Sequence, residues 1–210
     1  MKLVSILLLC ALMPLARAGA VVEGQVNLAL IPKAPPVKPN VRYQNKIEIA
    51  QPEPPSAVVY LEGSFAPSTN KHASVEQKNY QLHPALLPVE KGTVVDFPNG
   101  DDDYHSLFSF SKPKRFDLGQ YRKDDKPASQ TFNTPGVVRL FCEIHEHMRG
   151  VILVLETPYF VRTDKDGKYR LENLPAGSYK LKAWLDEKIV LEKPIELKDG
   201  ETLKVDFTAK

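Results

Sequence analysis

The stretch Phe141-Cys142-Glu143-Ile144-His145-Glu146-His147-Met148 places a thiol, an imidazole and a thioether at Cys-x2-His-x2-Met spacing. It continues a mostly apolar run over residues 137–141 that is typical of a buried β-strand. The strand would therefore deliver Cys142, and the residues after it would deliver His145 and Met148. This arrangement predicts a metal site at the end of a β-strand.

A second imidazole is available upstream, at His105 in the run Asp103-Tyr104-His105-Ser106-Leu107-Phe108. Two imidazoles, one cysteine sulfur and a weak axial methionine form the donor set of a blue-copper electron-transfer site. We therefore predict one copper ion bound by His105, Cys142, His145 and Met148. Zinc can use the same donors, but the affinity order of divalent metals favours copper. The plain alternative is a buried free cysteine with unrelated surface histidines.

Residues 1–18 are predicted to be an export signal rather than part of the fold. Lys2 supplies a positive charge, residues 3–15 are mostly apolar, and Ala16-Arg17-Ala18 has the small-x-small pattern of a cleavage site. The apolar run is too short for a membrane span. We expect a periplasmic protein without a membrane span. Its one remaining cysteine, Cys142, would need protection in an oxidising compartment, and a metal is the simplest protector.

The composition argues against several classes of function. The sequence has 28 Lys and Arg residues against 26 Asp and Glu residues, and removing residues 1–18 takes away two of the basic ones. A balanced chain gives no electrostatic reason to expect a nucleic-acid or membrane partner. The chain also lacks a Cys-x2-Cys-His haem motif, a nucleotide-binding loop and a Ser-His-Asp signature. We therefore expect neither an enzyme nor a nucleic-acid-binding protein.

Short alternating segments bounded by turn residues predict an all-β fold. Pro occurs 18 times and Gly 11 times, and no long segment repeats apolar residues at helical spacing. Residues 93–97 and 150–155 are predicted strands, and residues 74–80 are predicted to form one strand. Hairpin turns recur near residues 164–167, 173–177 and 198–200. This regular spacing is typical of β-sandwiches.

Residues 73–155 resemble the cupredoxin family. The resemblance rests on Gly92-Thr93-Val94-Val95-Asp96-Phe97-Pro98-Asn99, on His105, on Pro135-Gly136-Val137-Val138 and on the Cys-x2-His-x2-Met motif. The short motif is most similar to that of amicyanin, and the wider run resembles periplasmic plastocyanin-like proteins of the methylamine-utilisation type. The resemblance implies a Greek-key β-sandwich with copper as its cofactor, which we place at residues 71–155.

The resemblance also implies a role for each donor. Cys142 would give the short thiolate bond, His105 and His145 the equatorial nitrogens, and Met148 the weak axial sulfur. His145 would be the partly exposed ligand through which the electron leaves. Ser106 stands where many cupredoxins have an asparagine that ties the two ligand loops together.

A second resemblance concerns the rest of the chain. The run over residues 163–179, with Asp164-Lys165-Asp166-Gly167 and Asn173-Leu174-Pro175-Ala176-Gly177, resembles the carboxypeptidase regulatory-like domain, a transthyretin-type β-sandwich. The segment after residue 155 is short for a core of its own. We therefore predict that residues 19–70 and 156–210 form one discontinuous domain around the cupredoxin-like segment. The alternative is that the N-terminal strand joins the cupredoxin-like sandwich.

Several polar segments near the motif have two interpretations. His147 is interpreted as a contact for solvent or a partner rather than a further ligand. The acidic run at residues 101–103 is interpreted as a solvated turn rather than an attractor of copper or of a basic partner. The basic residues within 112–115 and 121–123 suit an acidic redox partner or a solvated loop equally well.

These observations predict a mononuclear blue-copper protein that carries single electrons between periplasmic redox proteins of unknown identity. Two alternatives stay open at this point. One is a periplasmic copper carrier or sensor, which would use the same ligands but exchange the metal readily. The other is a structural β-sandwich protein with a vestigial copper site.

Overall fold

The computed structural model describes residues 18–32, 51–69 and 71–208. These residues form β-strands and one short 3-10 helix, Leu28–Leu30, without any α-helix, so the predicted all-β class is confirmed. The predicted export signal lies outside the described residues except for its last residue, Ala18. In the described part of the chain, no helix is long and apolar enough to cross a membrane.

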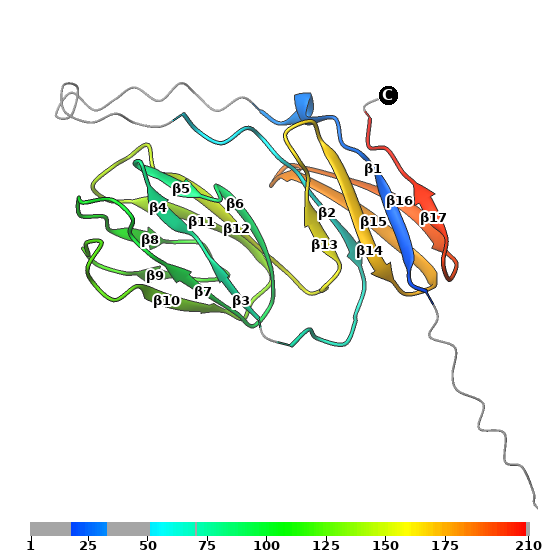
Figure 1. Cartoon of the computed structure of the whole chain (residues 1–210), viewed down its shortest axis with the longest axis horizontal. Coiled ribbons are helices and arrows are strands. Elements are labelled where there is room, and N and C mark those ends of the chain that lie inside the picture. Colours follow the sequence, from blue (N-terminus) through cyan, green and yellow to red (C-terminus); the bar gives the residue numbers. More distant parts are fainter. Residues whose placement is uncertain (1–17, 33–50, 70, 209–210) are drawn as a thin grey trace, which may run out of the picture.

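The strands form two β-sandwiches that lie next to each other (Figure 1). The central sandwich, defined as residues 72–155, contains a five-stranded sheet in the order β6-β12-β11-β8-β9, a three-stranded sheet in the order β10-β7-β3, and the hairpin β4-β5. In chain order its strands are β3 (His72–Ser74), β4 (Glu76–Lys78), β5 (Gln81–His83), β6 (Leu86–Glu90), β7 (Thr93–Phe97), β8 (Leu107–Ser109), β9 (Phe116–Asp117), β10 (Ala128–Phe132), β11 (Gly136–Cys142) and β12 (Arg149–Leu155).

The core of the central sandwich explains the alternation in β11. Val138 and Leu140 are buried while Arg139 between them is exposed, and Cys142 is buried again, because successive side chains of a strand point to opposite faces. The buried side chains share one apolar cluster with Phe97 of β7 and Phe132 of β10, which belong to the facing sheet. Cys142 therefore stands at the end of a strand whose inner face is fixed by packing.

The segment predicted as one strand over residues 74–80 is divided in the structure. β3 ends at Ser74, β4 is a separate strand, and Asn79 and Tyr80 form the turn to β5 with φ angles of 51° and 59°. Two consecutive residues with positive φ are typical of a type I′ hairpin turn. Tyrosine is uncommon at positive φ. Neither the residue type nor the alternating pattern of the sequence therefore indicates a turn at Tyr80.

The terminal sandwich is formed by strands from both ends of the described chain. One sheet has the order β14-β1-β17 and the other has the order β13-β2-β15-β16. Its strands are β1 (Ala20–Gln25), β2 (Val58–Glu62), β13 (Phe160–Arg162), β14 (Lys168–Leu174), β15 (Gly177–Asp186), β16 (Ile189–Leu197) and β17 (Thr202–Lys204).

Strands that precede the central sandwich pair with strands that follow it. β1 is antiparallel to β14 and parallel to β17, with Val22 opposite both Leu171 and Leu203. β2 lies between β13 and β15. The N-terminal strand β1 is thus part of a sheet of the terminal sandwich and not of the central sandwich. The assignment of residues 19–70 and 156–210 to one discontinuous domain, with residues 71–155 as the other, stays a prediction.

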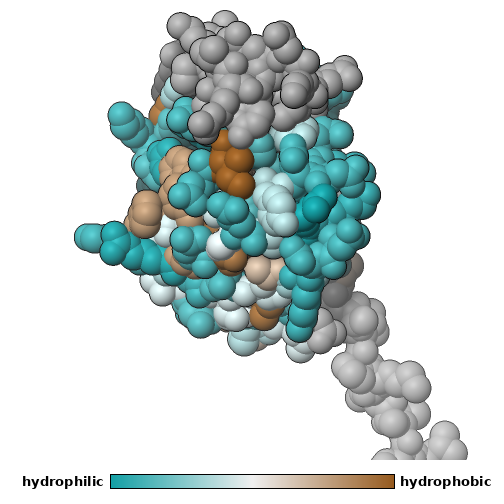
Figure 2. All heavy atoms as spheres, turned by 90° about the vertical axis from the view of Figure 1, so that its left-hand side faces the viewer, coloured by the Kyte–Doolittle hydropathy of each residue, from teal (hydrophilic) through white to brown (hydrophobic). Residues whose placement is uncertain are grey.

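An apolar junction connects the two sandwiches. Leu153 and Leu155 of β12 form a buried cluster with Val58 of β2 and Trp184 of β15. These side chains lie on the outer faces of their sheets, away from the two cores. The opposite end of the central sandwich, at the left of Figure 1, has a mainly hydrophilic surface with small hydrophobic patches (Figure 2).

We expect the fragment of residues 156–210 alone to lack a cooperative unfolding transition. Without β1 and β2 it loses the buried Val22, Val26, Val59 and Leu61, each contributing roughly 1.5–3 kcal/mol. Urea unfolding followed by circular dichroism, with the chain from residue 19 onward as the control, checks this. A cooperative transition in the fragment would show that the N-terminal strands are dispensable and that the discontinuous arrangement is wrong.

Candidate metal centre

His105 is held by backbone hydrogen bonds just before β8. Its N–H donates to the Tyr121 carbonyl (3.1 Å) and its own carbonyl accepts from the Tyr121 N–H (3.0 Å). The side chain is fully buried. The position of the imidazole is therefore set by the sheet edge and by the packing around it.

Cys142 and His145 are placed by the end of β11 and the tight loop that follows. Cys142 is opposite Leu107 of β8 in the antiparallel ladder. The loop closes through two backbone bonds, from Cys142 N–H to the Met148 carbonyl (3.2 Å) and from Met148 N–H to the His145 carbonyl (2.9 Å). A short loop with internal hydrogen bonds fixes where His145 stands relative to the sulfur.

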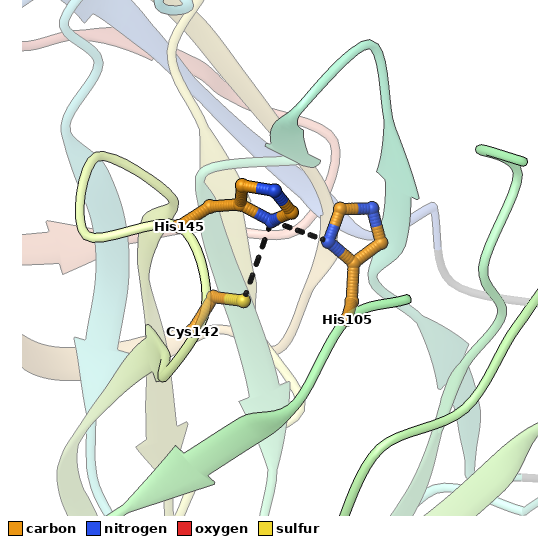
Figure 3. Close-up of side chains that lie close together, drawn as sticks. All are labelled: His105, Cys142 and His145. Carbon is orange, nitrogen blue, oxygen red and sulfur yellow. Dashed lines mark hydrogen bonds between the residues drawn. The ribbon is translucent and has the colours of Figure 1, made fainter. Parts of the chain in front are cut away.

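The structure brings His105, Cys142 and His145 together (Figure 3). The Nδ1 atoms of the two imidazoles are 3.1 Å apart, and the Cys142 Sγ is 3.9 Å from the His145 Nδ1. All three residues are buried, and their donor atoms lie within 4.8 Å of one another. Around one ion with metal–nitrogen distances of about 2.0 Å and a metal–sulfur distance of about 2.3 Å, donors are separated by about 3–4 Å. The residues present thus fit a mononuclear metal site.

Met148 is fully buried in the same apolar cluster as Cys142. Its carbonyl accepts the Cys142 N–H, so the two residues adjoin at the backbone. The role of the Met148 sulfur as an axial ligand stays a prediction. The roles assigned to His105, Cys142 and His145 as metal ligands also stay predictions, since they follow from the resemblance.

The two histidines change the acidity of the cysteine. Burial raises the pKa of the Cys142 thiol, but hydrogen bonds from His105, His145 and the backbone N–H groups of Ser106 and His145 outweigh it and lower the pKa to about 5. For His105, burial lowers the pKa of the imidazole, but its interactions with Cys142 and Asp101 outweigh burial. The pKa of His105 is therefore raised above its usual value. The site is built for a thiolate, which is the form of cysteine that binds metals.

Asp101 contacts the predicted ligand His105, which the sequence interpretation missed. The acidic run was expected to be a solvated turn, but the Asp101 side chain is only 9% exposed and its Oδ2 lies 2.9 Å from the His105 Nε2. Its carboxylate also accepts the backbone N–H groups of Asn79 (2.7 Å) and Tyr80 (3.0 Å). A carboxylate at Nε2 favours the tautomer that leaves Nδ1 free for a metal. The spacing of four residues between Asp101 and His105 was the available signal. The neighbouring Asp102 is exposed, as expected.

The turn at Tyr80 covers the two histidines. The Tyr80 ring meets His105 and His145 edge to face, at centroid distances of 5.9 and 5.1 Å, and its hydroxyl donates to Asp103 (2.8 Å). His145 was expected to be partly exposed, but it is only 4% exposed. The expectation was wrong because this hairpin, which the sequence pattern did not predict, packs over the ligand loop.

Ser106 connects the two ligand loops, as the resemblance suggested for this position. Its carbonyl accepts the Glu143 N–H (2.9 Å) and its hydroxyl donates to the Glu143 carboxylate (3.3 Å). His147 is half-buried, with its ring centroid 6.0 Å from that of His145. Burial, together with the charges of His145 and His105, lowers the pKa of His147. His147 does not belong to the group of three converging donors.

No protein-family model and no curated protein matches the chain. Several solved structures are similar to part of it. A Cu-containing nitrite reductase from Thermus scotoductus is 25% identical with a TM-score of 0.38, and the match covers 40% of this chain and 22% of the reductase. A purple cupredoxin from Nitrosopumilus maritimus is 23% identical with a TM-score of 0.36, over 40% of this chain and 99% of that protein. The reduced P52G mutant of amicyanin is 19% identical with a TM-score of 0.37, over 46% of this chain and 98% of amicyanin. TM-scores this low do not establish membership of a family or a function.

We expect the Cys142 thiol of the metal-free protein to titrate near pH 5. The ultraviolet absorbance of the thiolate should be present at neutral pH and disappear as the pH falls through about 5. Subtracting the Cys142→Ser protein isolates the signal. His105→Ala should move the midpoint upward, because it removes a hydrogen bond to the thiolate. A midpoint near the ordinary value of about 8.5 in the unsubstituted protein would contradict the thiolate assignment.

We expect Asp101→Asn to weaken Cu(II) binding by about 10- to 100-fold, the usual effect of removing a partner of a ligating histidine. The amide no longer offers a charged acceptor to His105. Competition against a chelator of known affinity measures the change. Asp102→Asn is the matched control, because that side chain is 93% exposed. Equal affinities for the two variants would show that Asp101 does not orient the ligand.

Proposed function

We propose that the protein is a mononuclear blue-copper protein that carries single electrons between redox proteins of the periplasm. The observation that carries the proposal is the buried group of His105, Cys142 and His145, with three donor atoms spaced for one ion. A copper ion bound there would supply a one-electron Cu(I)/Cu(II) couple. His105, Cys142 and His145 would hold the ion, and Met148 would supply the weak fourth donor.

The choice of copper follows from the chemistry of the donors. A thiolate and a thioether are soft ligands that suit Cu(I), and imidazoles suit both oxidation states. The lowered pKa of Cys142 supports a thiolate at neutral pH. A cysteine and two histidines with a long axial methionine are the set expected of an electron-transfer site rather than of a structural zinc site.

The surrounding residues would keep the site rigid and dry. The ladder between β8 and β11 fixes Cys142 at the end of β11, and the Tyr121 backbone bonds fix His105 just before β8. Asp101 orients the His105 ring, and Tyr80 covers both histidines. A site whose ligands are held by the fold changes little between oxidation states, which favours fast electron transfer. The proposal involves no transformed substrate, so we do not assign an enzymatic activity.

The proposal also covers the types of the two sandwiches, the location of the protein and its partners. We assign the central sandwich to the cupredoxin type, on the motif of residues 142–148 and on His105. We assign the terminal sandwich to the carboxypeptidase regulatory-like type, on its sequence resemblance and on the pairing of β1 with β14. Residues 1–18, as the predicted export signal, would direct the protein to the periplasm. Its redox partners would be periplasmic proteins.

A copper carrier is the alternative that uses the same ligands. A carrier must release its ion, whereas His145 is only 4% exposed and lies beneath the Tyr80 ring. This burial favours retention of the metal and therefore electron transfer. Rapid loss of Cu(I) to a competing chelator would favour the carrier instead.

The decisive experiment is a visible and paramagnetic resonance spectrum of the protein after Cu(II) is added, compared with the Cys142→Ser variant. We expect an intense thiolate-to-copper absorption band and a narrow copper hyperfine splitting, both lost in the variant. These signals require a covalent copper–thiolate bond. An ordinary weak Cu(II) spectrum that does not respond to the substitution would overturn the proposed function.

A further inference from the structure

Among the described residues, the outer face of the five-stranded sheet is covered over only part of its width. Its β12 side packs against the terminal sandwich through Leu153 and Leu155, which contact Val58 and Trp184. The strands β8 and β9 lie at the opposite edge of this sheet. The outer side chains there and at the end of β11 belong to none of the buried clusters that join the sandwiches. The uncovered part is thus a continuation of an apolar face already used for one contact.

Three phenylalanines form the centre of the uncovered part. Phe108 of β8 and Phe141 of β11 are cross-strand partners, with stacked rings 5.7 Å apart. Phe110 follows β8, and its ring centroid lies 5.1 Å from that of Phe108. Phe110 is 70% exposed, the highest value among the exposed large hydrophobic residues of the described chain. Phe108 and Phe141 are half-buried and lie next to it. A contiguous group of aromatic rings that reaches the surface is typical of sites that bind other molecules.

Two arginines border these rings. The guanidinium carbon of Arg115 lies 5.9 Å from the Phe110 centroid, and that of Arg149 lies 5.9 Å from the Phe141 centroid. Their Nε–H groups donate to backbone carbonyls, and neither arginine has a salt bridge to a carboxylate of the described residues. Arg139, on the same face of β11, is instead paired with Glu187 at 2.8 Å. Arg115 and Arg149 therefore keep charge available for an acidic group from outside.

This surface adjoins the candidate metal centre through the chain itself. Phe141 directly precedes Cys142 at the end of β11, and Arg149 directly follows Met148 at the start of β12. A covalent path of few bonds thus leads from the Cys142 sulfur through the backbone to Phe141, whose ring stacks on that of Phe108. A partner seated here would lie within a few bonds and contacts of the predicted copper ligand.

We propose that Phe108, Phe110, Phe141, Arg115 and Arg149, together called the aromatic–arginine surface, form the docking site for an acidic electron-transfer protein. This inference rests on the proposed function and specifies its partner. Carboxylates of the partner would meet Arg115 and Arg149, and an apolar centre would cover Phe110. Such an interface is small and transient, as redox encounters are, and the charges would serve mainly to steer association.

Charge distinguishes a protein partner from a nucleic acid. Aromatic rings next to arginines also suit single-stranded nucleic acids, but those sites add a groove of cations along the backbone. The sequence as a whole has a net charge of +2, and Asp117 stands opposite Phe108 on β9. A surface with two available guanidinium groups and a carboxylate at its edge fits a compact acidic patch better than a polyanionic chain.

The location is tested with hexacyanochromate(III), a paramagnetic anion that is inert to electron transfer. It is added to the reduced protein, and line broadening of the backbone amide resonances is recorded. We expect broadening around residues 108–115 and near Phe141 and Arg149, and its loss in the double variant Arg115→Gln/Arg149→Gln. Arg122→Gln is the matched control, since Arg122 also lies over an exposed ring, that of Tyr104, but donates to the Asp102 carbonyl (3.1 Å) in the acidic run 101–103. Broadening centred elsewhere, or equal loss in the control, would overturn the proposal.

Kinetics test the functional consequence. Oxidation of the reduced protein by hexacyanoferrate(III), which takes up one electron and becomes hexacyanoferrate(II), should slow by about 3- to 10-fold at low ionic strength in the double variant, as expected when steering charges are removed. The Arg122→Gln protein should react at the unsubstituted rate. Unchanged rates in the double variant, or amide shifts at this surface with oligothymidylate at physiological salt, would overturn the assignment to an acidic protein. The anion map can also be recorded on metal-free protein, so a failure to bind copper is distinguishable from a failure of the docking site.

Discussion

Two residue pairs between β8 and β11, Phe108 with Phe141 and Leu107 with Cys142, determine the position of the other parts of the site. Cys142 ends one strand and His105 stands just before the other, so antiparallel pairing brings these distant residues together. The pairing extends one step beyond the strands, where the Glu143 N–H reaches the Ser106 carbonyl. A ladder fixed by core packing therefore sets the donor spacing before any metal is bound.

That spacing creates an electrostatic problem inside the protein. A thiolate away from water is costly unless it is hydrogen-bonded or paired. Here His105, His145 and backbone N–H groups surround Cys142, and Asp101 in turn supports His105. Each of these groups offsets the unfavourable free energy of burying its neighbour. Removing one group would therefore leave its neighbours buried without a compensating interaction. A metal ion would complete the same compensation, because it requires the thiolate that the site already favours.

The sequence allowed prediction of the all-β class and of the residues that converge, because both depend on local patterns: strict alternation along strands and fixed spacing of donors after a strand. It did not allow prediction of the Tyr80 hairpin or the burial of His145. Tyr80 has a positive φ angle, which is uncommon for tyrosine, so its residue type does not indicate a turn. Its ring also contacts His145, which lies much later in the chain. Asp101 was misjudged for a related reason. A carboxylate in an acidic run is usually solvated, and only the tertiary fold shows that this one faces an imidazole.

The pairing of β1 with β14 has a consequence for the order in which the chain can fold. All strands of the central sandwich lie within residues 72–155, so a chain that emerges from its N-terminus can complete that sandwich first. β1 must wait for β14 and β17, with Val22 facing Leu171 and Leu203. Contacts between such distant segments form slowly, since a long loop must close first. During synthesis, the apolar faces of β1 and β2 therefore stay without their partner strands after the central sandwich is complete, and this interval is when the chain most needs protection from aggregation.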